Sequence, residues 1–414
     1  MKGLVFTLSI PRYAVAKALG RRFPALHYGR GSCLSLREVP EPRPPGPDWL
    51  SVRPRMAGLC GSDMATIFFK ASPVLEPFNS FPAVLGHEVL AELPERGERR
   101  GALEPGQRVV VNPLLPCRLR GVEPPCVPCA SGKENGCERS AEGHLAPGLM
   151  LGYHRDLPGG MGERMVAHPS QLYPVPRDVP DEVAVLVEPL AVSLHGVLKH
   201  VPRDGDRVLI VGGGPVAFAT LWAVRALGCK CHVTLLTTEG YQLELAKGMG
   251  ADEVLRAARD DLEEAQAVAG LTGAKVYRPV IGPPAMTGGF ELVFDCVGSQ
   301  ASVQDSLRYA RSLGKVVLLG AAGALPRVDW TTVWKNELTI AGSYTYGTED
   351  FRGRAVHTFQ AVLELLERRE GPDPRPLVTH RFKLSEYGQA IEANLYRGRH
   401  KSVKAVFDLR GGAA

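Results

Sequence analysis

The sequence predicts an α/β protein with two domains, an irregular β-barrel-like domain and a doubly wound parallel sheet. Its 414 residues exceed what one ordinary hydrophobic core organises, and a share of 44% hydrophobic against 22% charged residues is typical of globular proteins. Proline and glycine are abundant in the first half, which indicates a loop-rich, β-dominated region. After Glu188 and Pro189 strands alternate with helices, and this order favours a parallel sheet.

Strand patterns dominate the first half. Residues 1–9 alternate loosely as a strand, residues 14–23 have short helical character, and a proline-rich turn follows at 40–47. Residues 50–56 and 107–112 are expected strands, the second because it contains a run of β-branched valines. Together these segments predict the β-barrel-like domain.

Short apolar strands and helices alternate in the second half. The expected strands are 207–211, 231–236, 292–297 and 315–319, and the expected helices are 215–227 and 241–248. A long amphipathic helix at 355–369 and a last strand at 403–409 are expected to pack back on the first domain. We therefore predict one domain from residues 1–188 with 344–414, and a second from 189–343.

Four cysteines lie in one loop rich in glycine and proline, namely Cys117, Cys126, Cys129 and Cys137. Four thiolates at such spacing are typical of a closed, structural zinc site, although the first gap of eight residues is long. A site that has lost its metal, or redox chemistry, are the alternatives. Disulfides are disfavoured because we find no leader-like segment and the other cysteines are scattered, so we expect a reducing, cytoplasmic setting.

A second set of ligand-type residues flanks this loop. Cys60 and the pair His87 and Glu88 precede it, and Glu188 follows it. Mixed Cys, His and carboxylate ligands are typical of a catalytic zinc that keeps one coordination position open. The sequence therefore predicts two Zn²⁺ ions per chain.

A glycine loop opens the second domain. Gly212 to Ala217 follow an apolar strand and begin a helix, which matches the dinucleotide-binding pattern. In that pattern Gly212 permits the tight turn, Gly214 lets a pyrophosphate approach, and Pro215 and Val216 open the helix whose N-terminus favours negative charge.

The ribose position is less distinct. An acidic residue commonly ends the second strand, but here Thr237, Thr238 and Glu239 stand there. The missing carboxylate removes repulsion of a 2′-phosphate, yet no arginine or lysine lies between Cys231 and Leu245 to bind one. We expect NAD, with Glu239 as a substitute for the usual acid, and NADP stays open.

Seven motifs in order resemble the zinc-containing medium-chain dehydrogenase/reductase family, and most closely its polyol (sorbitol) and threonine dehydrogenases. They are GLCGSD (58–63), GHE (86–88), the four-cysteine loop, EPLAVSLH (188–195), VGGGPVA (211–217), FDCVGS (294–299) and SVKAVFDL (402–409). The resemblance covers nearly the whole chain. It implies a GroES-like catalytic domain, a Rossmann cofactor domain, and a homodimer or homotetramer.

The resemblance also implies roles for single residues. It assigns the catalytic zinc to Cys60, His87 and Glu188. Glu88 would lie in or near that shell, Asp63 would orient the ligating imidazole, and Ser62 would hydrogen-bond the substrate oxygen. Val297 and Lys404 fall at positions that the resemblance places beside the cofactor.

The implied activity is hydride transfer between a secondary alcohol or polyol, or the matching ketone, and NAD(P), with zinc polarising the substrate oxygen. Ala65 departs from the family because many relatives have a relay histidine there. A biosynthetic carbonyl or imine reduction, or a cyclisation, on the same fold is therefore an alternative, as is a non-catalytic, zinc-stabilised regulatory protein that binds NAD(P).

Two segments are longer than the family pattern, the region between the first strand and Leu34 and the stretch 256–290. Either could shape a substrate cleft or a subunit interface, or be a surface excursion. Short basic clusters such as Arg21-Arg22 and Arg118–Arg120 form no long run, so nucleic acid is not an expected partner. No stretch approaches the roughly 20 apolar residues of a membrane helix, so we expect no membrane partner either.

Overall fold

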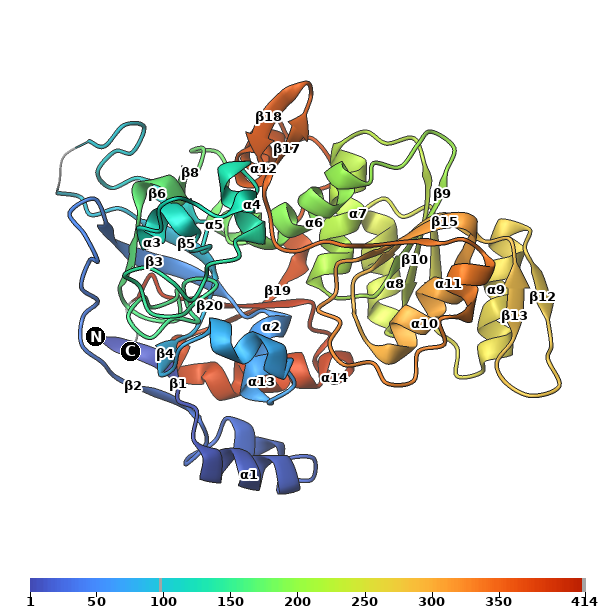
Figure 1. Ribbon diagram of the computed structural model, residues 1–414, viewed down its shortest axis with the longest axis horizontal. Helices are drawn as coiled ribbons and strands as arrows, with labels where there is room; N and C mark the ends of the chain where they lie inside the picture. Colours follow the sequence, from blue (N-terminus) through green and yellow to red (C-terminus); the bar gives the residue numbers. More distant parts are fainter. Residues whose placement is uncertain (97–98, 412–414) are drawn as a thin grey trace. The chain divides into compact units, whose positions relative to one another are not determined.

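The computed structural model, which describes residues 1–96 and 99–411, divides into two compact units (Figure 1). Unit 1 takes in residues 1–188 and the segment from 378 onward, and unit 2 takes in residues 189–377. Unit 1 is built mainly from antiparallel strands, and unit 2 from a parallel sheet with helices. The predicted α/β class is confirmed.

The main sheet of unit 1 runs in the order β19-β20-β3-β5-β6-β8, and β7 pairs with β3. Its strands are β3 (Leu50–Gly58), β5 (Glu88–Glu92), β6 (Arg108–Val111), β7 (Met165–Ala167), β8 (Leu172–Pro174), β19 (Val378–Phe382) and β20 (Lys404–Asp408). A smaller sheet consists of β2 (Leu34–Glu38), β1 (Lys2–Phe6) and β4 (Ala83–Val84). Because β20 pairs with β3, the last strand of the chain completes the sheet that the first half begins.

Short helices connect these strands. They are α1 (Ile10–Leu19), η1 (Pro24–His27), α2 (Gly61–Ile67), η2 (Pro73–Phe78), α3 (Cys117–Arg120), α4 (Val127–Ala130), η3 (Glu134–Gly136), η4 (Pro169–Gln171), α5 (Asp181–Ala184), η6 (Leu384–Glu386), α13 (Tyr387–Leu395) and α14 (Arg397–His400). The helix expected at 14–23 starts four residues earlier, because Pro11 suits a first helical turn, and it ends before Gly20.

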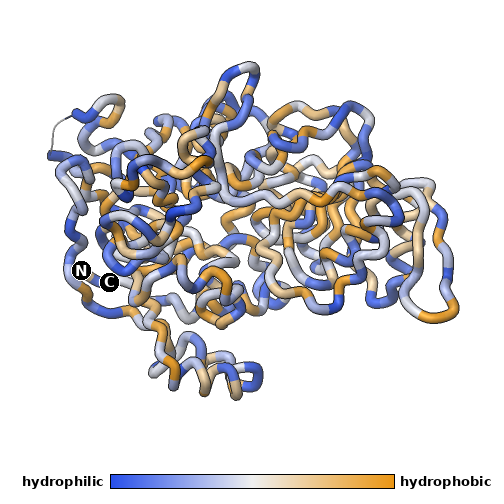
Figure 2. Tube along the Cα trace, viewed as in Figure 1, coloured by the Kyte–Doolittle hydropathy of each residue, from blue (hydrophilic) through white to orange (hydrophobic). Residues whose placement is uncertain are grey.

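Unit 2 contains a six-stranded parallel sheet in the order β11-β10-β9-β14-β15-β16. The strands are β9 (Arg207–Val211), β10 (His232–Thr237), β11 (Glu253–Arg256), β14 (Phe290–Asp295), β15 (Ala310–Leu318) and β16 (Thr339–Gly342). The helices are α6 (Val187–Lys199), which begins at the end of unit 1, α7 (Pro215–Ala226), α8 (Gly240–Gly248), α9 (Asp261–Thr272), α10 (Gln300–Tyr309) and α11 (Thr331–Lys335). The central strands are continuous apolar runs, as burial on both faces requires, and hydrophobic residues concentrate along them in Figure 2.

The end of unit 2 differs from the predicted division, which assigned residues from 344 onward to the first domain. The segment that follows β16 contains β17 (Thr348–Phe351), β18 (Arg354–His357), α12 (Thr358–Glu367) and η5 (Arg375–Leu377). It packs on unit 2, because His195 Nδ1 lies 3.0 Å from Glu349 Oε1 and Gly371 abuts Ala226 of α7. Its helix begins at Thr358 rather than at 355, since the His357 side chain accepts the N–H of Phe359 and caps it.

The long 256–290 stretch contains α9 and a hairpin. The strands of the hairpin are β12 (Lys275–Tyr277) and β13 (Ala285–Thr287). Among the described residues, no helix is both long and apolar enough to cross a membrane.

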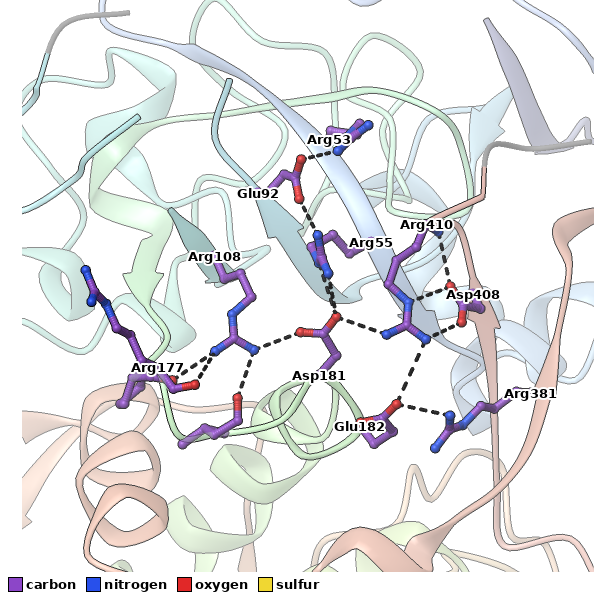
Figure 3. Close-up of polar contacts among 12 residues, drawn as sticks. Arg53, Arg55, Glu92, Arg108, Arg177, Asp181, Glu182, Arg381, Asp408 and Arg410 are labelled. Atoms are coloured by element: carbon purple, nitrogen blue, oxygen red, sulfur yellow. Dashed lines mark hydrogen bonds and ion pairs between the residues drawn. The ribbon is translucent and has the colours of Figure 1, made fainter. Parts of the chain in front are cut away.

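An ion-pair network stabilises unit 1 (Figure 3). At its centre Asp181, on α5, accepts hydrogen bonds from Arg55 on β3 and Arg108 on β6, and an ion pair joins it to Arg410 after β20. Glu92 on β5 extends the network through Arg55. The network therefore joins segments that are far apart in the sequence.

Candidate functional site

Three ligand-type side chains converge in unit 1. Cys60 is the residue before α2, and His87 and Glu88 stand at the start of β5. Gly58, near the end of β3, pairs in register with Glu88, which brings the two segments together. One ligand atom from each of Cys60, His87 and Glu88 lies within 4.8 Å of the others. A sulfur, an imidazole nitrogen and a carboxylate oxygen at this spacing fit a zinc ion with one open position.

A hydrogen-bonded carboxylate orients the imidazole of His87. Asp63 is fully buried, and its Oδ1 lies 3.4 Å from His87 Nδ1. Asp63 also accepts the backbone N–H of Cys60 at 3.0 Å and the hydroxyl of Tyr153 at 3.1 Å. With Nδ1 directed at Asp63, Nε2 faces the opposite side, where Ser62 Oγ lies 3.3 Å away. This is the arrangement that fixes a metal-ligating histidine in one tautomer.

The electrostatics of this cluster are strongly coupled. Burial opposes charge on His87, but the charges of Asp63 and Cys60 outweigh it and raise the His87 pKa well above its usual value. Burial also opposes ionisation of Asp63, yet the charge and hydrogen bond of His87 lower the Asp63 pKa. Burial raises the pKa of Glu188 to about 8. A bound divalent cation would favour the neutral imidazole and the ionised carboxylates, because its charge stabilises anionic ligands.

Two predicted site residues have contacts that the sequence did not predict. Glu188, in the first turn of α6, is buried within electrostatic reach of His87 and Glu88, but it does not join the set of mutually close ligand atoms. Lys404, expected beside the cofactor, is buried on β20, where its ammonium group forms an ion pair with Glu88 and donates to the carbonyl of Leu59 at 3.3 Å. The pairing of β20 with β3 brings Lys404 to the carboxylate of Glu88.

The four cysteines of the loop also come together. Cys117, Cys126, Cys129 and Cys137 each offer a sulfur within 4.8 Å of the other three. Cys117 Sγ lies 3.5 Å from Cys126 Sγ and 3.7 Å from Cys137 Sγ. A zinc ion held by four thiolates at about 2.3 Å separates the sulfurs by about 3.8 Å, so the observed spacings fit a tetrahedral site.

A buried arginine supports this loop. Arg120 ends α3 and has no exposed surface. Its guanidinium donates to the carbonyls of Leu115, Glu142 and Ala146 at 3.0 to 3.1 Å. Burial lowers the Arg120 pKa, and the nearby Cys137 and Cys117 oppose that shift. Arg120 thus fastens residues 142–146 beside the cysteines.

The glycine loop lies at the carboxyl ends of β9 and β14, where the strand order reverses and where such sheets bind ligands. Gly212 has φ +126°, a conformation that favours glycine, and a Cβ there would lie 2.8 Å from Val297. Gly214 precedes α7, which starts at Pro215 and Val216. The predicted loop residues therefore gather around the N-terminus of a 12-residue helix, which suits a pyrophosphate.

The predicted ribose residues separate into two groups. Thr237 is buried, and its hydroxyl hydrogen-bonds to Gln242, whose amide donates to the Gly213 carbonyl at 2.6 Å. Thr238 is exposed and Glu239 is half-buried. Arg256, the register partner of Thr237 on β11, donates to the Thr238 carbonyl at 3.3 Å. A cation thus lies beside the residues that were predicted to bind the ribose.

Comparisons with known proteins agree with this geometry. The model of the alcohol dehydrogenase GroES-like domain matches residues 46–177, and that of the zinc-binding dehydrogenases matches residues 215–365. L-idonate 5-dehydrogenase of Vitis vinifera is 30% identical over 88% of this chain and 89% of the relative. This chain belongs to the zinc-containing medium-chain dehydrogenase/reductase family. It is therefore an oxidoreductase of the alcohol dehydrogenase type, a class that uses zinc and a nicotinamide cofactor.

Other matches are a polyol dehydrogenase and two solved structures with the same fold. Sorbitol dehydrogenase of Macaca fascicularis is 27% identical over 91% of this chain and 94% of the relative. An alcohol dehydrogenase from E. coli CFT073, solved with NADH, shares the fold with a TM-score of 0.71, 23% identity and 99% coverage of both chains. A structure from Sinorhizobium meliloti 1021, described as a zinc-binding dehydrogenase bound to NADP, has a TM-score of 0.69 and 25% identity over 91% of this chain and 96% of that one.

Three residues of the dehydrogenase site were not predicted in the positions that they take. Tyr153 and Arg256 are not among the polar site residues that the sequence predicted, and Lys404 was expected only as a cofactor contact. Each reaches its partner through pairing or packing between distant segments: Tyr153 reaches Asp63, Lys404 reaches Glu88, and Arg256 reaches Thr238. The hydroxyl of Tyr153 was the one local signal, because a buried tyrosine hydroxyl usually has a polar partner.

Proposed function

We propose that this dehydrogenase transfers a hydride between the carbinol carbon of a secondary alcohol or polyol and the nicotinamide of NAD(P). The observation that supports this best is the convergence of Cys60, His87 and Glu88, three different ligand types whose donor atoms lie within 4.8 Å of one another. A bound zinc ion would polarise the substrate oxygen, and the cofactor would accept or donate the hydride.

The side chains around this set have distinct roles in the proposal. Cys60, His87 and Glu88 would hold the zinc, and Glu188, which lies within electrostatic reach of Glu88, would exchange with it as a ligand. Asp63 holds the His87 ring through Nδ1, so that Nε2 stays available to the metal. Ser62 stands 3.3 Å from that nitrogen and would hydrogen-bond the substrate oxygen.

The proton route is proposed to differ from that of many relatives. Ala65 offers no proton-carrying group, so proton transfer from the substrate hydroxyl would pass from Ser62 through Thr66, Glu88 or water. Biosynthetic reduction of a carbonyl or imine on the same site is the second candidate function, and Ala65 is the observation that favours it.

We further propose a second, structural zinc held by the four cysteines, Cys117, Cys126, Cys129 and Cys137. The sulfur separations of 3.5 and 3.7 Å support it. Such thiolates persist in a reducing compartment, so we propose a cytoplasmic location. We also propose that the protein is a homodimer or homotetramer that acts on a small-molecule substrate.

We propose that NAD(P) binds at the loop of Gly212, Gly214, Pro215 and Val216. Val297 would contact its nicotinamide half. At the ribose end Glu239 favours a free 2′-hydroxyl, whereas Arg256 favours a 2′-phosphate. Arg256 shifts the expectation from NAD toward use of both cofactors.

Zinc content and turnover of matched variants test the proposal. Wild type is expected to hold two zinc ions per chain and to oxidise members of a polyol and secondary-alcohol panel. Cys60→Ser should keep one zinc and lose turnover, Cys126→Ser should lose the other zinc and stability, and Cys229→Ser, which lies in unit 2 and belongs to neither set, should change neither. One zinc in wild type that Cys60→Ser does not remove would contradict the catalytic site. Reduction of carbonyls or imines without alcohol oxidation would favour the biosynthetic alternative.

A further inference from the structure

The excess positive charge of the whole chain resides in one N-terminal segment. Residues 8–33 contain five of the 49 basic residues, Arg12, Lys17, Arg21, Arg22 and Arg30, and none of the 44 acidic ones. The remainder therefore has 44 basic and 44 acidic residues and is neutral, while the chain as a whole carries +5. This segment also lies in the region that the sequence predicts to be longer than the family pattern.

Helix α1, which this segment forms, presents its apolar side to solvent. It projects from the rest of unit 1 (Figure 1), and Ala16 is its one buried residue. Tyr13 packs edge-on against Phe69 with ring centroids 4.9 Å apart, and Arg12 donates to the Ser32 carbonyl at 2.9 Å. These contacts anchor one side of the helix and leave the other side uncovered.

The uncovered side contains no polar residue. At about 100° per residue, one half of the helix circumference carries, in angular order, Ile10, Ala14, Ala18, Pro11, Val15 and Leu19. Ile10 is 79% exposed, Val15 50% and Leu19 51%. Arg12 and Lys17 border this half on its two sides. A soluble helix normally buries such a stripe, so its exposure indicates a partner.

The exposed apolar surface continues beyond the helix. Leu8, before it, is 46% exposed and Phe23, after it, is 53% exposed. Figure 2 shows hydrophobic and hydrophilic residues interleaved along this projecting segment. We call the side chains of Leu8, Ile10, Val15, Leu19 and Phe23 the N-terminal apolar face.

A basic pocket adjoins the N-terminal apolar face. It has a volume of about 460 Å³ and lies between η1 and α13–α14, with Arg22, Phe23, Tyr396, Arg399 and His400 among its lining residues. Its one carboxylate, Glu392, accepts a hydrogen bond from the Tyr28 hydroxyl at 3.0 Å. Across the described parts of the chain, no acidic side chain forms an ion pair with Arg21, Arg22 or Arg399.

We propose that the N-terminal apolar face and its basic rim dock the enzyme onto an anionic lipid surface. An apolar helix face bordered by lysine and arginine is the pattern of a helix that lies in the plane of a bilayer interface. Each basic residue near the surface adds electrostatic attraction to acidic headgroups, and the adjoining pocket offers two guanidinium groups to one headgroup phosphate.

Other occupants fit these observations less well. A contact with a second copy about a twofold axis through this face would place the segment against itself, and its five cations would then repel their equivalents. A nucleic acid would use the cations but would leave the apolar half of α1 uncovered. The expected absence of a membrane partner rested on the lack of a spanning segment, and a helix that lies on the surface needs none.

Flotation of the full-length protein with vesicles tests this proposal. Binding is expected to phosphatidylcholine vesicles that contain phosphatidylglycerol, and it should weaken with salt; pure phosphatidylcholine should bind far less. Neutralising two cations in Arg21→Gln/Arg22→Gln should lower the partition coefficient about 25-fold. Val15→Ser/Leu19→Ser, which keeps the charge, should lower it at least about tenfold.

Matched control variants test whether vesicle binding depends on where the charged and apolar side chains lie, and not only on how many there are. Lys230→Gln/Lys247→Gln removes the same charge from exposed positions in unit 2, and Val280→Ser/Ile281→Ser removes two exposed apolar side chains from the β12–β13 loop. Both should bind vesicles like wild type. Alcohol turnover without lipid should be unchanged in every variant, which shows that each is folded.

Several outcomes would overturn the proposal. One is that the protein does not float with anionic vesicles at low salt. Another is that the control variants lose as much vesicle binding as the N-terminal variants. Self-association that Val15→Ser/Leu19→Ser abolishes would assign the N-terminal apolar face to a second copy instead. Binding of a DNA or RNA duplex that depends on Arg21 and Arg22 but not on Val15 and Leu19, without vesicle binding, would assign the cations to nucleic acid.

Discussion

Gly58 occupies a position in β3 where any side chain would meet the candidate metal centre. A Cβ at residue 58 would overlap the Glu88 carboxylate and lie 2.9 Å from Lys404 Cε. Because Glu88 and Lys404 are buried and paired, neither side chain can move away without leaving the other charge buried and unpaired. The absence of a side chain at residue 58 is therefore part of how the ligand set is positioned.

The prediction at this position concerns metal affinity. Gly58→Ala should displace Glu88 and weaken zinc binding at the Cys60 and His87 site by about 10 to 100-fold, while the four-cysteine metal stays bound. Chelator titration followed by zinc analysis measures both. Gly61→Ala is the matched control, because a Cβ there meets no atom within 4 Å. If Gly58→Ala kept both ions at wild-type affinity, Glu88 would not be a ligand.

Arg256 leads to a second prediction at the residue scale, about cofactor choice. Its guanidinium lies at the ribose end of the glycine loop, beside the Thr238 carbonyl. Hydrogen bonds to a charged phosphate contribute about 1.5 to 3 kcal/mol, so Arg256→Gln should lower kcat/KM for NADP about tenfold or more and leave the value for NAD nearly unchanged. Glu239→Gln should raise the NADP value by removing a repulsive charge.

Steady-state kinetics with both cofactors provide the measurement. Arg259→Gln, an exposed arginine three residues further on, serves as the control and should alter neither value. Equal losses for NADP and NAD in Arg256→Gln would show that the arginine supports the loop rather than a 2′-phosphate.

At the scale of elements, the four-cysteine loop has little regular structure of its own. Its helices α3 and α4 are four residues each, so its shape depends on side-chain contacts such as those of the buried Arg120, and on the proposed zinc. Arg120→Met keeps much of the side-chain volume but leaves the carbonyls of Leu115, Glu142 and Ala146 without their donor. Such unsatisfied buried groups should cost about 3 kcal/mol of unfolding free energy.

Urea unfolding and the rate of zinc release to a chelator test this prediction. Arg120→Met should release the four-cysteine zinc faster than wild type. Arg118→Met makes the same chemical change two residues away, where the side chain is 40% exposed and pairs with Glu134. That control should cost less than about 1 kcal/mol. Equal effects of the two variants would mean that the carbonyl contacts of Arg120 do not stabilise the loop.

Elements with local signals could be predicted from the sequence, whereas contacts set by strand register could not. The cysteine loop and the strand, glycine turn and helix at 207–226 carry their own residue patterns, and both were expected. The choice between Glu88 and Glu188 depends on β3 pairing with β5, and the place of Lys404 depends on β20 pairing with β3. The ribose arginine depends on the parallel pairing of β10 with β11. No nearby residue encodes these pairings.

At the scale of the whole molecule, the chain returns to unit 1 only for its last segment, and charged side chains reinforce that return. Arg410, just after β20, meets Asp181, which also binds Arg55 on β3 and Arg108 on β6 (Figure 3). The backbone pairing of β20 with β3 and this network act on the same two segments. The stability of unit 1 should therefore depend on the ionisation of Asp181.

The Asp181 carboxylate is nearly buried, and its pKa determines how the stability of unit 1 depends on pH. Burial alone would raise the Asp181 pKa, but hydrogen bonds from Arg108 and Arg55 outweigh burial and lower it. A lowered folded-state pKa means that the stabilisation is present above the unfolded pKa of about 3.9 and is lost as the pH falls through the folded-state value. Unit 1 should accordingly lose this contribution only in acid, below about pH 4.

Asp181→Asn isolates this contribution. The variant leaves three guanidinium groups without their shared anion, which should cost about 2 kcal/mol at neutral pH after allowance for solvent screening of the partly exposed Arg410. The difference in unfolding free energy between wild type and Asp181→Asn should shrink as the pH falls from 7 to 3, because protonated aspartic acid and asparagine are both uncharged. Asp178→Asn, at an exposed position nearby, should match wild type throughout. A difference that stayed constant over this range would mean that Asp181 stabilises unit 1 through packing or neutral hydrogen bonds, and that the arginines do not depend on its charge.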